Sequence, residues 1–297
     1  MRAVFALMRP KQWSKGLLVF AAPLFAQRLT NPVDLGHTLL AFVAMALVSS
    51  AVYIFNDLLD VERDRAHPVK RNRPIASGAV SVKRAKVVMA GLILVGLGLG
   101  SIVGLAALGF LATYVGLQVA YNASLKHIAV ADVFCLSLGF VLRASLGAAA
   151  VQVGISGWLL FCTGALALML GFGKRRHEWQ LQGESRTTSR ESLGGYTQPL
   201  LDACLQMAAT SAAMSYGVYS IESPTARGHP ALIFTALFVF YGIYRYMYLV
   251  LATDEGGEPE TLMFRDRHLV LTVLLYTLSA LIALRIGRIA LLETVAG

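Results

Sequence analysis

The chain has 297 residues, of which 56% are hydrophobic and only 14% are charged. Because soluble domains average about 25% charged residues, this composition excludes an ordinary soluble domain and indicates a membrane protein. The formal net charge is +9, which loops at a membrane surface explain without nucleic acid as a partner.

Nine apolar stretches follow one another along the chain, each long enough to cross a bilayer as a helix of about 20 residues. The alternating pattern of membrane β-barrels does not occur, so helices are expected. The sequence predicts an all-α, polytopic bundle of nine transmembrane helices, forming a single domain over residues 1–297. The expected spans are residues 14–30, 37–57, 85–104, 106–123, 130–150, 156–173, 200–221, 231–250 and 269–290.

The basic residues are concentrated in the connections on one side of the predicted membrane. Most of the 26 Lys and Arg residues precede the first span or follow every second span, which places the N-terminus and these segments in the cytoplasm. The polar residues gather in the same segments, and this favours an enzyme with a cytoplasmic site. A transporter, the alternative, would place ionisable residues near mid-span, where Arg143 is the clearest candidate.

Four acidic or amide residues lie at the cytoplasmic end of the second expected span. On a helix, Asn56, Asp60 and Asp64 recur every four residues, with Asp57 beside them. Carboxylates so close repel each other unless a cation lies among them, and Mg²⁺ commonly joins carboxylates to substrate phosphates. We predict that Asp57, Asp60 and Asp64 bind Mg²⁺ and that Asn56 orients a ligand; the alternative is a solvated helix end neutralised by nearby arginines.

The loop that follows, "HPVKRNRPIASG", is basic. Lys70, Arg71 and Arg73 are expected to bind phosphate oxygens, since both residue types bind phosphate and Arg does so with two parallel hydrogen bonds. Acids beside bases suit a metal-bound polyphosphate: the acids hold the metal and the bases hold the remaining phosphate oxygens. The alternative is that these cations only set the topology.

Two further cytoplasmic segments offer weaker candidates. In "YNASLKHIAVAD", Lys126 can reach a phosphate or anchor the turn at the membrane interface, and Tyr121 and Asp132 are secondary candidates for substrate contacts. In "GKRRHE", Lys174 and Arg175 can bind phosphate or mark only the cytoplasmic side.

The remaining candidates are fewer. Lys15 either meets the phosphate of a lipid or anchors an interfacial helix, and the anchor is favoured. The cysteines Cys135, Cys162 and Cys204 all lie in expected spans, where they act as small apolar packing residues.

The N-D-x-x-D-x-x-x-D pattern after the second of nine expected helices resembles the UbiA superfamily of intramembrane prenyltransferases, over essentially the whole chain. Segments such as "MRPKQWSKGLLVFAAPLF", "YNASLKHIAVAD", "LRASLGAAA" and "GEPETLMFRDR" are similar to its decaprenyl-phosphate phosphoribosyltransferase branch. The resemblance implies a nine-helix bundle in a bacterial-type plasma membrane. It also implies Mg²⁺-dependent transfer of 5-phosphoribosyl from 5-phosphoribosyl 1-diphosphate (PRPP) to a polyprenyl (decaprenyl) phosphate, for cell-envelope arabinan precursors.

One departure separates this chain from the prenyl-transferring members, which usually carry a D-x-x-x-D motif near the start of their sixth helix. Here the sixth span begins "SGWLLFCTG" without a carboxylate, which favours the ribosyl branch over the alternative of a true prenyltransferase. A homo-oligomer is compatible with the sequence. For the reactants that the resemblance implies, we assign catalytic roles to Asp57, Asp60, Asp64 and Lys126. We assign substrate contacts to Asn56, Lys70, Arg71, Arg73, Tyr121, Asp132, Lys174, Arg175 and Lys15.

Overall fold

The computed structural model describes residues 2–182, 191–253, 261–262 and 265–285. Every regular element in these ranges is an α-helix or a 3-10 helix, and no strand occurs among them. The expected all-α class is therefore confirmed. The segment "GEPETLMFRDR" and the last expected span, residues 269–290, lie partly outside the described residues.

Seven helices of the described part are long and apolar enough to cross a membrane. Two other segments cover the remaining expected spans: α10 (Gln198–Glu222), and the 3-10 helix η1 (Pro10–Phe20) with α2 (Ala21–Phe25). The count of nine spans stays a prediction. The seven helices are α3 (Pro32–Leu59), α5 (Val82–Val103), α6 (Leu105–Ala123), α7 (Ala131–Ala150), the stretch Gly157–Leu181, the stretch Pro230–Ala252 and α14 (Arg267–Arg285).

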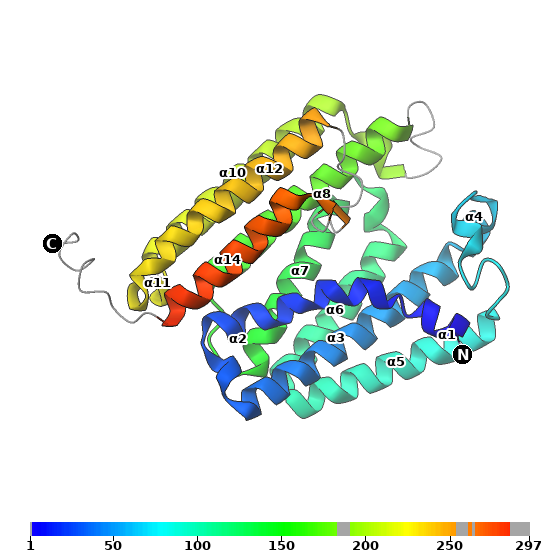
Figure 1. Ribbon diagram of the computed structural model, residues 1–297. Helices are drawn as coiled ribbons and strands as arrows, with labels where there is room; N and C mark the ends of the chain where they lie inside the picture. Colours follow the sequence, from blue (N-terminus) through cyan, green and yellow to red (C-terminus); the bar gives the residue numbers. More distant parts are fainter. Residues whose placement is uncertain (1, 183–190, 254–260, 263–264, 286–297) are drawn as a thin grey trace. The chain divides into compact units, whose positions relative to one another are not determined.

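The chain divides into two compact units (Figure 1). The first comprises Met1–Ser124 and Gly139–Ile155, and the second comprises Leu125–Leu138 and Ser156–Gly297. Helix α7 therefore contributes its first turns to the second unit and the rest to the first.

The first unit is built around α3. Asn31 caps its start by accepting hydrogen bonds from the amides of Val33 and Asp34, and Pro32 fits the first helical turn. The helix buries small and branched residues against α5, α6 and α7. Gly147 of α7 lies against the backbone of Val19, where any side chain would clash. Because glycine has no side chain, α7 and the Val19 segment can pack closely. The shorter elements of this unit are α1 (Arg2–Leu7), η2 (Arg28–Thr30), α4 (Val61–Ala66) and η3 (Lys70–Asn72).

The second unit packs α8 (Gly157–Gln182) against α10, α10 beside α12 (Ala236–Ala252), and α12 beside α14 (Figure 1). Its core joins Met169 and Phe172 of α8 to Leu205 and Ala209 of α10 and Tyr246 of α12. The 3-10 helices η4 and η6 lie at the polar ends of α7 and α8. The shorter elements are η4 (Leu125–His127), η6 (Glu191–Gly195), α11 (Pro224–Gly228) and η7 (Pro230–Thr235).

Candidate functional site

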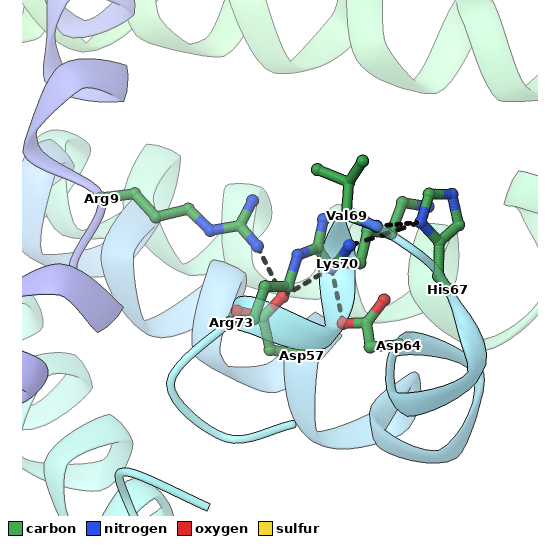
Figure 2. Close-up of polar contacts among 7 residues, drawn as sticks. All are labelled: Arg9, Asp57, Asp64, His67, Val69, Lys70 and Arg73. Carbon is green, nitrogen blue, oxygen red and sulfur yellow. Dashed lines mark hydrogen bonds and ion pairs between the residues drawn. The ribbon is translucent and has the colours of Figure 1, made fainter. Parts of the chain in front are cut away.

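Two buried carboxylates converge on one arginine in the first unit. Nη1 of Arg73 donates hydrogen bonds to Oδ1 of Asp57 at 3.1 Å and to Oδ2 of Asp64 at 2.7 Å (Figure 2). The two Asp residues are only 2% and 3% exposed, respectively. The cation lies between the acids because two carboxylates buried so close together would otherwise repel each other.

A second arginine, Arg9, reaches the same acid from the N-terminal segment. Its Nη2 donates to Oδ1 of Asp57 at 2.5 Å, and its guanidinium lies over the ring of Tyr53, 5.0 Å from the ring centre. Ser50 of α3 fixes the segment by donating to the carbonyl of Met8 at 2.8 Å. Sequence reasoning missed this contact because 48 residues separate the two partners, and no local spacing reports such a tertiary pair.

The expected stripe of acids on one helix does not form, because α3 ends at Leu59 and a new helix, α4, begins at Val61. Asp60 is the residue between them, with φ −96° and ψ 10°. Asp57 of α3 and Asp64 of α4, on the two sides of this break, both contact Arg73. Asp60 and Asn56 are half-buried nearby in the sequence.

The basic loop after α4 is ordered by His67. Its Nδ1 accepts hydrogen bonds from the amides of Val69 and Lys70, at 3.2 and 3.3 Å (Figure 2). Lys70 and Arg71 are exposed, whereas Arg73 is half-buried against the acids. Of the three predicted phosphate-binding cations, the structure therefore brings one to the carboxylates and leaves two at the surface.

The paired acids suit a divalent metal. No group of three or more His, Cys, Asp or Glu residues within the described ranges is arranged to hold a metal ion, but Mg²⁺ is commonly bound by one or two carboxylates together with waters and substrate phosphates. Asp57 and Asp64 already direct one oxygen each at a single cationic nitrogen. This donor set fits Mg²⁺ with a phosphate ligand better than a cage made of protein alone.

The second unit has its own buried charge cluster, centred on Asp132 at the start of α7. The Asp132 carboxylate is 0% exposed. It accepts hydrogen bonds from Nε of Arg175 at 2.7 Å, the hydroxyl of Tyr196 at 2.8 Å and the hydroxyl of Ser192 at 3.1 Å. The predicted contact of Asp132 with a substrate stays a prediction, and the observed contacts give this residue an additional role within the fold.

Arg175 is equally enclosed. It is 1% exposed, and its Nη1 donates to Oε2 of Glu178 at 2.6 Å. Burial and the nearby Asp132 carboxylate raise the pKa of Tyr196 well above its usual value, so the phenol stays protonated and donates to that carboxylate. Sequence reasoning missed Ser192 and Tyr196, because they lie 60 and 64 residues after Asp132 and no local spacing reports such contacts.

The other predicted site residues are partly exposed on separate elements. Lys126 lies on η4 and Lys174 on α8, both in the second unit. Tyr121 lies on α6 and Lys15 on η1, both in the first unit. All four are half-buried, and their roles stay predictions.

Arg143 lies buried inside the first unit. Its guanidinium donates to the carbonyl of Gly139 at 2.9 Å and to the hydroxyl of Tyr114 at 2.8 Å, and lies 4.8 Å from the centre of the Tyr114 ring. Ser49 of α3 accepts a longer hydrogen bond of 3.5 Å. None of the ion pairs within the described ranges includes Arg143, so it links α3, α6 and α7 through hydroxyl, carbonyl and aromatic groups.

Comparison with known proteins identifies the family. The model of the UbiA prenyltransferase family matches residues 17–267. The decaprenyl-phosphate phosphoribosyltransferase of Corynebacterium glutamicum is 34% identical over 285 residues, which cover 94% of this chain and 86% of the relative. The enzyme of the same name from Mycobacterium tuberculosis is 35% identical over 282 residues, covering 91% and 90%.

Solved structures agree on the fold. A UbiA homologue from Archaeoglobus fulgidus, bound to GPP and Mg²⁺, superposes with a TM-score of 0.76 at 14% identity and covers 96% of this chain and all of that one. Identity at this level supports the fold alone. Taken with the family model and the curated relatives, it shows that the chain belongs to the UbiA prenyltransferase family.

Proposed function

We propose that this protein transfers the 5-phosphoribosyl group of PRPP to a polyprenyl phosphate, with decaprenyl phosphate as the expected acceptor, and releases diphosphate. The observation that carries the proposal is the similarity to decaprenyl-phosphate phosphoribosyltransferases, at 34–36% identity over about nine-tenths of the chain. The buried acids and arginines of the first unit provide the groups that a metal-bound diphosphate needs.

The donor site is centred on Asp57, Asp64 and Arg73. Asp57 and Asp64, with Asp60, hold Mg²⁺, which when bound neutralises the charge that develops on the departing diphosphate. Arg73 and Arg9 hold the carboxylates in place before the donor arrives and then offer their guanidinium groups to phosphate oxygens.

Residues of the basic loop and of the N-terminal half of the chain provide the remaining proposed substrate contacts of the first unit. The exposed Lys70 and Arg71 contact the diphosphate or the 5-phosphate of the donor. Asn56 orients the bound donor, and Tyr121 contributes a further contact. Lys15 is the candidate contact for the phosphate of the lipid, with anchoring of the interfacial segment as its favoured role.

The bond changes need little acid–base chemistry. The bond between C1 of the ribose and the diphosphate oxygen breaks, and C1 forms a bond to an oxygen of the lipid phosphate. That oxygen is already anionic at neutral pH, so no general base has to take a proton from it. Attack from the face opposite the diphosphate inverts the configuration at C1, and the protein acts through positioning and electrostatics.

The second unit supplies further cations. Lys126 contacts the donor and stabilises charge on a phosphate as the bond breaks, which gives it a catalytic role. Lys174 contacts phosphate as well, and the buried Arg175 and Asp132 support substrate binding. We propose that both units act as one domain in this reaction.

The location of the chemistry follows from the charge distribution. The chain is a multi-pass membrane protein, and the distribution of Lys and Arg supports a cytoplasmic N-terminus and active site in the plasma membrane of a bacterium. The product serves as a precursor for the arabinan of the cell envelope. A homo-oligomer is compatible with this arrangement.

The second candidate function is transfer of an isoprenoid from a prenyl diphosphate to another acceptor. A digeranylgeranylglyceryl phosphate synthase from Saccharolobus solfataricus is 35% identical, but over only 95 residues, or 32% of this chain. The start of α8 lacks the carboxylates that the prenyl-transferring members use there. Both observations favour the ribosyl donor.

The donor can be identified with the purified protein in lipid nanodiscs. It is incubated with Mg²⁺ and decaprenyl phosphate, and with either PRPP or geranylgeranyl diphosphate carrying a radioactive label. We expect label from PRPP in the lipid fraction, with the mass of a phosphoribosyl adduct. Label transferred from the prenyl diphosphate alone would refute the proposal.

A further inference from the structure

A strained residue lies in the turn that carries Lys126. Val130 has φ +69°, in the left-handed region that β-branched residues rarely occupy because their Cβ substituents crowd the backbone. Such a conformation persists only where the surroundings enforce it, and it occurs most often at functional sites. The proposed function uses Lys126 but gives no reason for this strain.

The hydroxyl of Tyr196 enforces it. The amide of Val130 donates a hydrogen bond of 2.5 Å to that hydroxyl, which in turn donates to Oδ1 of Asp132 at 2.8 Å. A phenol has one proton to give and lone pairs to accept with, so both contacts can form together. The negative charge of Asp132 fixes the direction of the proton, which leaves the oxygen lone pairs facing Val130.

Two more contacts fix the turn to the same segment. Nδ1 of His127 pairs with Oε2 of Glu191 at 3.0 Å. Ala129 lies so close to Gly195 that a Cβ on the glycine would be 2.8 Å from the Cβ of Ala129. The segment η6–Tyr196 therefore holds the turn at His127 and Ala129, which precede the strained residue, and at Val130 itself.

The Tyr196 segment is itself anchored to α8. Trp179 donates from its indole nitrogen to the carbonyl of Tyr196 at 3.0 Å, and Arg175 shares the Asp132 carboxylate with Tyr196. Tyr196 thus connects the turn that carries Lys126 to the helix that carries Lys174.

We propose that Tyr196 is a positioning residue, which holds the strained α6–α7 turn at Val130 so that Lys126 is presented to the phosphates of the donor. Tyr196 touches no substrate; it acts through the turn. The inference rests on the proposed role of Lys126 in the transfer reaction.

The test combines loss of the hydroxyl with relief of the strain. Tyr196→Phe removes only the oxygen that holds the Val130 amide. Val130→Gly removes the steric penalty, because glycine adopts positive φ without it. The control is Tyr216→Phe, which deletes another buried hydroxyl of the same unit, hydrogen-bonded to Thr235 at 2.7 Å.

We expect Tyr196→Phe to lower kcat/KM for PRPP about tenfold, the effect of losing one buried hydrogen bond in the transition state, without changing KM for decaprenyl phosphate. Adding Val130→Gly should restore most of the loss, and Tyr216→Phe should leave both constants near those of the wild type. Activity of Tyr196→Phe within twofold of the wild type would overturn the inference, as would a double variant no better than Tyr196→Phe.

Hydrogen exchange of the amides of residues 124–131 gives a readout that needs no turnover. We expect faster exchange there in Tyr196→Phe and no change in Tyr216→Phe. If the wild type does not transfer phosphoribosyl, the proposed function fails, and the exchange result decides about Tyr196 alone: unchanged exchange overturns the positioning role, and faster exchange supports it.

Discussion

At the scale of single residues, the proposed donor site balances the charges of two acids and two arginines. Asp57 and Asp64 are almost fully buried, and Arg73 contacts both of them while Arg9 contacts Asp57 alone. A metal-bound diphosphate offers the same charges in reverse: its cation suits the acids and its oxygens suit the arginines. The site can therefore exchange partners without leaving a buried charge uncompensated.

The first prediction concerns Arg73. Arg73→Ala should lower kcat/KM for PRPP about a hundredfold, since a donor of charge-assisted hydrogen bonds to the leaving group is lost. It should also lower the melting temperature in metal-free buffer, because Asp64 then loses its arginine and faces Asp57, which keeps only Arg9. Added Mg²⁺ should recover part of that thermal stability. Differential scanning fluorimetry and initial rates measure both effects.

The matched control is Arg84→Ala, which removes an exposed arginine from the first turn of α5 in the same unit. Equal losses of kcat/KM in the two variants would mean that Arg73 acts only through its positive charge at this surface and not through a specific contact.

At the scale of elements, Arg143 joins three membrane helices of the first unit. It reaches Tyr114 on α6 and Ser49 on α3 from its own helix α7. A buried arginine without a carboxylate is expensive in a bilayer, and here hydrogen bonds and two aromatic rings, those of Tyr114 and Phe140, surround it. Because α3 ends at the acids, the same contacts fix the helix that presents Asp57.

A double-mutant cycle tests this link. Arg143→Leu and Tyr114→Phe should each destabilise the protein in detergent, and their combination should cost less than the sum of the two by about 1 kcal/mol, since they remove the same contact. The free energy of unfolding is measured by denaturant titration for the wild type, the two single variants and the double variant. Strictly additive effects would show that the two side chains do not cooperate.

The helical elements and the acidic motif could be predicted from the sequence because both depend on local pattern. Apolar stretches of about 20 residues gave the spans, and the spacing of Asp57, Asp60 and Asp64 gave the motif. The break at Asp60, the contact of Arg9 with Asp57 and the burial of Arg175 could not be predicted in this way. They depend on which residues, distant in sequence, pack together, and composition and periodicity carry no information on that pairing.

At the scale of the whole molecule, the distribution of Lys and Arg predicts the orientation in the membrane. The basic loop that contains Arg71 and Arg73 is expected in the cytoplasm, and the connection after α7 on the opposite side. The site must face the compartment in which PRPP is available, so orientation and function have to agree.

Cysteine labelling measures this orientation. Ser77→Cys and Gly154→Cys place thiols at exposed positions in the two connections, in a background where the three native cysteines are replaced by serine. In intact cells, a membrane-impermeant maleimide should label position 154 and should reach position 77 only after permeabilisation. The opposite pattern would reverse the predicted topology and place the acids outside.

The central claim is that the buried acids bind the metal-bound donor. Equilibrium binding of PRPP to the purified protein in nanodiscs, with and without Mg²⁺, tests it most directly when Asp64→Asn is compared with Glu62→Gln, which alters an exposed acid of the same helix. We predict Mg²⁺-dependent binding in the wild type and in Glu62→Gln, and a loss of at least about tenfold in affinity in Asp64→Asn. Equal, Mg²⁺-dependent affinity in all three proteins would contradict the account.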